Sequence, residues 1–76
     1  MIKEHDRVVL KKDIPAHALT EGDVGTVVHG YANEAAFEVE FVTLDGNTAA
    51  VVTVSADALR PVHANEMPHA RERIPA

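Results

Sequence analysis

The chain has 76 residues, enough for one domain with one small hydrophobic core, so a deep substrate cavity is not expected. Hydrophobic residues make up 46% of it but aromatic residues only 4%, so the core must be built from Val, Leu, Ile and Ala. The formal charge of −5, from 7 Lys and Arg against 12 Asp and Glu, repels phosphate backbones and weighs against nucleic acid as the main partner.

Cysteine is absent, which excludes disulfides, thiolate catalysis and iron–sulfur ligation. A small domain without cysteine is typical of a reducing compartment, so we expect a cytoplasmic location. The sequence contains no apolar run of signal-peptide length at its start and nothing approaching the roughly 20 apolar residues of a membrane helix. We therefore expect no membrane partner.

The first predicted strand lies near the N-terminus. Val8 and Leu10 fall on one face of it, and Arg7, Val9 and Lys11 fall on the other. This alternation predicts a half-buried strand with a basic outer edge, followed by a loop in which a proline interrupts the pattern.

The second predicted strand follows two glycines, Gly22 and Gly25. Their spacing allows a sharp turn and then a close crossing of two backbones before the β-branched run that ends at Val28. The sequence therefore predicts a strand that bends tightly over a neighbouring strand.

The third predicted strand alternates cleanly. Its apolar residues Phe37, Val39 and Phe41 lie on the face opposite to Glu38 and Glu40. We expect the apolar face to point into the core and the two carboxylates to point outward.

A hairpin is predicted at Asp45 and Gly46, the strongest short turn signal in the chain. A two-residue turn there places Phe41 opposite Ala50 and Val42 opposite Ala49. A four-residue turn keeps the same faces, whereas a three-residue turn without a bulge would move the core residues of one strand outward. The predicted core is Val8, Leu10, Val27, Phe37, Val39, Phe41, Val52, Val54 and Leu59.

The last part of the chain predicts a single 3₁₀ turn near Ser55 and Asp57, which could cap the turn or form a local side-chain contact. A short final strand follows around Pro61. Residues 63–76 have further prolines, several charges and few apolar anchors, and are predicted to form a C-terminal tail.

This order of elements resembles that of an SH3-like barrel. Gly22, Gly25 and Val27 match the Gly-x-x-Gly-x-Val signature of the SH3-like barrels of the KOW and nitrile hydratase β-subunit types. The resemblance implies an all-β, five-stranded SH3-like barrel over residues 1–62, with a 3₁₀ turn before the last strand and a tail over 63–76.

A more specific resemblance covers the same residues. The chain is similar to a family of small bacterial proteins of unknown function that share four stretches, found here at Ile2–Leu10, Gly22–Val28, Glu38–Phe41 and Leu59–Val62. This resemblance implies a fold and no activity. In nitrile hydratase the metal is held by cysteines of the other subunit, so that likeness implies only a role in packing against a larger protein and assisting its assembly.

Catalytic, metal and cofactor sites are not expected. The five histidines, His5, His17, His29, His63 and His69, do not have the short fixed spacings of metal ligands. Ser55 is the only serine and has no neighbouring histidine to act as a base. Glu38 and Glu40 share a face, but on an open sheet nothing would raise the pKa of one of them for acid–base catalysis.

Two binding functions remain open. The first is a non-catalytic interaction or accessory module that docks on a protein partner, such as a neighbouring gene product, or on a second copy. The second is a KOW-like nucleic-acid module, for which Lys3, Arg7, Lys11 and Lys12 offer a basic side but only Tyr31 offers an exposed ring. Proline-rich peptide binding is not expected, because it needs a groove lined with aromatic residues.

The predicted partner-binding surface is the outer face of the central hairpin. Apolar residues gather where a solvated sheet face is normally polar, and two carboxylates border them. The alternative interpretation is that the first loop or the tail folds over them. The residues predicted to form this surface are Val42, Ala49, Val51, Glu38 and Glu40.

Overall fold

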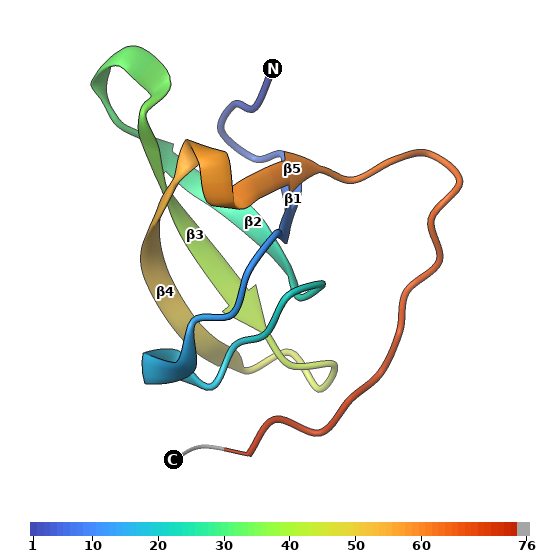
Figure 1. Ribbon diagram of the computed structural model, residues 1–76. Coiled ribbons are helices and arrows are strands. Elements are labelled where there is room, and N and C mark those ends of the chain that lie inside the picture. Colours follow the sequence, from blue (N-terminus) through green and yellow to red (C-terminus); the bar gives the residue numbers. More distant parts are fainter. Residues whose placement is uncertain (75–76) are drawn as a thin grey trace.

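A computed structural model describes residues 1–74 as one antiparallel sheet of five strands (Figure 1). The strand order in the sheet is β4-β3-β2-β1-β5, and three 3₁₀ turns connect the strands. The strands are β1 (Arg7–Leu10), β2 (Val24–Gly30), β3 (Ala36–Val42), β4 (Thr48–Ser55) and β5 (Leu59–Pro61), and the turns are η1 (Pro15–His17), η2 (Ala32–Glu34) and η3 (Ala56–Ala58).

The predicted all-β architecture is confirmed, including the five strands, the 3₁₀ turn before the last strand and the C-terminal tail. The sheet curls around its core but is not closed, because no pairing joins β4 to β5 within residues 1–74. The tail leaves β5 and sweeps in a wide arc to the opposite end of the molecule (Figure 1). The last two residues of the predicted tail, 75 and 76, lie outside the described residues.

The core lies inside the curl of the sheet. Every predicted core residue except Val52 is buried, and Val52 is partly buried against the same cluster. Two further residues complete the core, Leu19 and Ala58. Leu19 comes from the first loop, which folds back on itself through a bridge between Ile14 and Leu19.

The sequence predicted that Val9 lies on the outer, basic face of the first strand and is exposed. The predicted exposure is wrong, because the residue is only 5% exposed. Val9 has Val24 opposite it on β2 and Arg60 opposite it on β5. A residue in the middle of a sheet is shielded by neighbours on both sides, even on the outer face. Arg7 and Lys11 on either side of it are exposed, as predicted.

The close approach predicted at Gly25 is present, but it lies between two paired strands, β2 and β3, and is not a crossing of two backbones. A Cβ atom there would lie 2.5 Å from Val39 Cγ1, 2.9 Å from Phe41 Cε1 and 3.0 Å from the carbonyl oxygen of Glu40. Gly22 adopts a φ of +95°, a left-handed conformation that favours glycine. Gly22 therefore allows the turn before β2, and Gly25 leaves room for Val39 and Phe41 of β3, the strand that pairs with β2.

The hairpin between β3 and β4 has the predicted faces but not the predicted turn. The Thr43 amide donates to the Asn47 carbonyl at 2.8 Å and the Gly46 amide donates to the Thr43 carbonyl at 2.9 Å, which leaves a three-residue loop. A bulge then restores the register. Val42 therefore pairs with Thr48, not with Ala49 as predicted, while Phe41 still faces Ala50.

Candidate protein-interaction face

The five residues predicted to bind a partner belong to the β3–β4 hairpin. In the β3–β4 pair, Glu40 lies opposite Val51, and Val42 is the next outward residue along β3. Ala49 is the extra residue of the bulge, and it lines the same groove as Val42. We call Val42, Ala49, Val51, Glu38 and Glu40 together the outer face.

The apolar members of the outer face remain accessible. Val42 is 55% exposed and Val51 is 50% exposed, so about half of each side chain meets solvent. Leu44, at the tip of the same hairpin, is 89% exposed. Three large apolar side chains on one hairpin are more than the scattered single residues that need no explanation.

The two carboxylates of the outer face are held in place by threonines of β4. The Thr48 hydroxyl donates to Glu40 Oε2 at 2.7 Å, and the Thr53 hydroxyl donates to Glu38 Oε1. These hydrogen bonds fix the carboxylates beside the valines. The outer face therefore has an apolar middle and an ordered acidic border.

Val24 was not predicted to belong to this face, yet it extends the apolar surface onto β2. It is 47% exposed and lines a groove together with Val42 and Leu44. Thr26 pairs with Glu40, so Val24, two residues earlier on β2, lies level with Val42. The alternation of β2 places Val24 on the outward side, so the sequence pattern could have predicted its exposure. The prediction for this strand rested instead on Gly22 and Gly25.

The C-terminal tail borders the outer face without covering it. Residues His69, Ala70, Arg71 and Arg73 line one side of the groove of about 270 Å³ whose other side is the hairpin tip. The expectation that the loop or tail folds over the apolar residues is therefore not met, because Val42 stays about half exposed.

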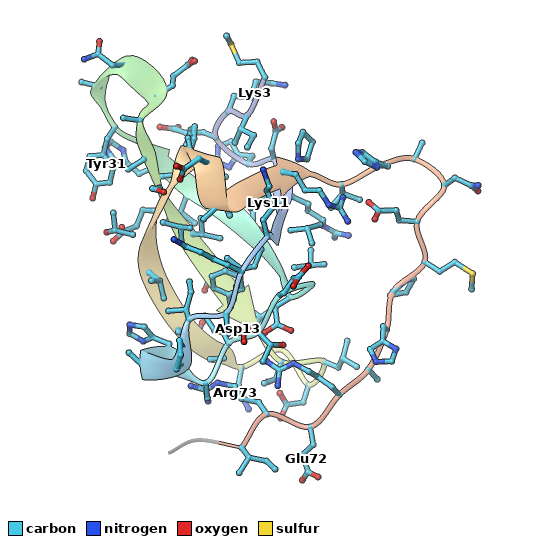
Figure 2. The ribbon with its side chains drawn as sticks, in the orientation of Figure 1. Lys3, Lys11, Asp13, Tyr31, Glu72 and Arg73 are labelled. Carbon is cyan, nitrogen blue, oxygen red and sulfur yellow. The ribbon has the colours of Figure 1, made fainter. Side chains whose placement is uncertain are left out.

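Two arginines fasten the tail to the first loop. Arg71 Nε donates to Asp23 Oδ1 at 2.8 Å, and Arg71 Nη2 donates to the other carboxylate oxygen of Asp23 and to the Ala18 carbonyl. Arg73 Nη2 donates to the His17 carbonyl at 2.9 Å. Figure 2 shows Arg73 extending from the tail toward η1, while Glu72 points away from the molecule.

The protonation of Asp23 reflects this contact. Burial by itself raises the pKa of Asp23, but hydrogen bonds from Arg71 and from the Thr20 amide, together with the charge of Arg71, outweigh it and lower the pKa below the ordinary value. The Asp23 carboxylate therefore stays ionised to a lower pH than that of an ordinary aspartate.

The histidines and Ser55 singled out in the sequence can be located in the structure. Among residues 1–74, no group of three or more His, Asp or Glu is placed to hold a metal ion. The Ser55 hydroxyl donates to Asp57, so it forms the predicted local side-chain contact, whereas it makes no capping hydrogen bond to η3.

No helix in this part of the chain is long and apolar enough to cross a membrane.

Lys3 and Tyr31, two of the residues expected to serve nucleic-acid binding, each contact a neighbouring side chain. Lys3 lies 3.5 Å from Asp6, which partly neutralises it. Tyr31 is 43% exposed, and its ring meets His29 edge-on at a centroid distance of 4.9 Å. In Figure 2, Lys3 and Lys11 lie on different segments from Tyr31.

Comparison with known proteins gives one match. No curated protein and no solved structure is significantly similar to the chain. A family profile described as "Domain of unknown function (DUF4926)" matches residues 4–61, which span all five strands and leave out the tail. The chain therefore belongs to the DUF4926 family, a family of domains of unknown function.

Proposed function

We propose that this domain is a non-catalytic interaction module that docks on a larger protein through the outer face. The observation that carries the proposal is the pair of half-exposed valines, Val42 and Val51, beside carboxylates that are already fixed by hydrogen bonds. An apolar centre edged by polar groups is the usual composition of a protein interface. The partner that fits is a protein with an apolar patch bordered by Lys or Arg.

The hydrogen-bonded carboxylates of Glu38 and Glu40 support this function, because their side chains are ordered before a partner binds. Docking a side chain that is already held in one rotamer loses less entropy than ordering a free one. The threonine contacts to Glu38 and Glu40 therefore favour binding with little rearrangement. Val24 and Leu44, which line the same groove as Val42, enlarge the apolar area.

The proposal includes a structural kinship. The strand order β4-β3-β2-β1-β5 and the glycine-bent β2 are consistent with an SH3-like barrel of the KOW or nitrile hydratase β-subunit type. Barrels of the second type pack against a larger subunit, and a role as companion of a neighbouring gene product follows the same pattern. We place this role in the cytoplasm, on the basis of the cysteine-free sequence.

A pulldown from the source cell, with and without nuclease, tests the proposal. We expect one protein in stoichiometric amount, unchanged by nuclease. Recovery of RNA or DNA, lost on nuclease treatment, would instead favour the KOW-like nucleic-acid function. The net charge of −5 weighs against that second result, because long-range repulsion slows the approach of a phosphate backbone.

A further inference from the structure

The edge of β4 that faces away from β3 is unpaired within residues 1–74. Within residues 1–74, β4 pairs with β3 along one side and with no strand along the other. In Figure 1 it forms the outer margin of the sheet. The opposite margin, β5, is only three residues long and contains Arg60 and Pro61, two features that discourage pairing with another chain.

The backbone hydrogen bonds show which groups of β4 are free. The Ala56 amide donates to the Ala35 carbonyl at 2.9 Å, so these two residues are a bonded pair of the β3–β4 ladder. Bonded and non-bonded pairs alternate along an antiparallel ladder. The Glu38–Thr53 and Glu40–Val51 pairs are therefore non-bonded, and the N–H and C=O groups of Val51 and Thr53 point away from the sheet.

The side chains of β4 leave its free edge unprotected. Its sequence, Thr-Ala-Ala-Val-Val-Thr-Val-Ser, contains no charged residue and no proline. Ala50 and Val52 on the inner face are only partly buried, and Val51 on the outer face is exposed. The outer face of β4 carries Thr48, Thr53 and Ser55 besides Val51, but none of these residues is charged. Natural edge strands usually carry a charge or a proline that blocks pairing with another chain, and β4 carries neither.

We propose that β4 pairs with β4 of a second copy of this chain, antiparallel and about a two-fold axis, so that the two sheets continue into one. Such an axis places outward residues opposite outward residues and inward residues opposite inward residues. The free groups of Val51 and Thr53 then bond to those of the partner. The partly exposed Val52 of each copy meets its counterpart and extends both cores.

Electrostatics favour the strand edge over the outer face as the contact between two copies. Across the β4 edge, Glu38 and Glu40 of the two copies lie three strand spacings apart, about 14 Å. This separation exceeds the Debye length of about 8 Å at physiological salt, so their repulsion is screened. Two outer faces packed together would bring the same carboxylates within about 10 Å of each other. The edge pairing uses different atoms from the outer face and does not rest on the proposed function.

The test uses the full chain and two measurements. Sedimentation at concentrations from about 10 μM to 1 mM should show a monomer becoming a dimer, because a single strand edge gives a small interface and a modest affinity. Over the same range, hydrogen exchange at the Val51 and Thr53 amides should slow by about tenfold. A constant monomer mass would overturn the proposal, and so would a dimer in which these two amides exchange as fast as in the monomer.

Variants separate the edge from the face. Thr53→Pro removes an outward N–H without breaking a β3–β4 backbone bond, and Thr53→Lys places a charge on the edge, so either variant should remain monomeric. Val42→Lys is the matched control, because it changes the outer face one strand away and should still dimerise. The proposal would be overturned if Thr53→Lys folded and dimerised as strongly as the wild type. It would also be overturned if Val42→Lys alone lost dimerisation.

Discussion

Val39 and Val52 lie directly opposite each other in the β3–β4 pair, but Val39 is fully buried whereas Val52 is only partly buried. The difference comes from position, because β3 has a neighbour on both sides and β4 has one. The same substitution at the two sites should therefore have unequal effects.

Val39→Asp should unfold the domain. An unpaired carboxylate in the core costs several kcal/mol, against a total stability of about 5 kcal/mol for a domain of this size. Val52→Asp should leave the chain folded with a lower melting temperature, because its carboxylate can reach solvent at the edge. Circular dichroism melting curves measure both. A native melting curve for Val39→Asp would mean that the faces of β3 are assigned incorrectly.

Gly25→Ala should destabilise the domain by about 1–3 kcal/mol, because the added methyl group meets Val39, Phe41 and the Glu40 carbonyl, which belongs to the backbone and cannot move aside. Gly30→Ala is the matched control on the same strand, since its Cβ would lie 3.4 Å from the nearest atom, on Phe37. Urea denaturation compares the two. Equal stability of the two variants would show that Gly25 does not lie as close to Val39, Phe41 and the Glu40 carbonyl as described.

Truncation after His63 should leave a folded domain. The tail adds no residue to the buried core within residues 1–74, and its Arg71–Asp23 ion pair is a partly exposed contact worth at most about 1 kcal/mol. We expect an unchanged fold and a melting temperature lowered by a few degrees at most. A large loss of stability would show that the tail is part of the folding unit.

Glu66 should titrate with a pKa of about 2, well below its ordinary value of 4.5. The first cause is its hydrogen bonds from Arg60, at 3.0 and 2.7 Å, and the His63 amide adds another at 2.6 Å. Because the pKa is lowered, this contact stabilises the start of the tail above about pH 4.5 and is lost as the pH falls toward 2.

Carboxyl-carbon NMR measures the titration of Glu66. In Arg60→Gln the pKa of Glu66 should rise toward 4.5, while Arg73→Gln, which removes a tail contact to the His17 carbonyl, should leave it unchanged. An ordinary pKa for Glu66 in the wild type would show that the start of the tail is not held by Arg60.

Local patterns in the sequence predicted most of the fold. Alternation assigned the faces of β3 and β4 correctly, and two glycines located the bend of β2, because both signals depend on residues close in sequence. The bulge at Ala49 could not be predicted, since a three-residue loop with a bulge gives the same faces as the turns considered. The burial of Val9 depends on strands that pair with β1 from distant parts of the chain.

The candidate site was predicted in part. The exposure of Val42 and Val51 followed from apolar residues at outward positions of the strands, and the role of this face in binding a partner stays a prediction. The ion pair between Arg71 of the tail and Asp23 of the first loop was not predicted, because these residues are 48 positions apart and no local pattern links them. Val24 was missed because its neighbours Gly22 and Gly25 gave a stronger signal.

The outer face is tested most directly by changing Val42 and Val51 together to Glu and measuring the binding of the partner recovered by the pulldown. Both side chains are about half exposed, so the double variant should keep the melting curve of the wild type within a few degrees. We expect its affinity for the partner to fall by at least about tenfold, because two carboxylates replace the apolar centre of the interface. A folded double variant that binds the partner as tightly as the wild type would contradict the assignment of this face as the interaction surface.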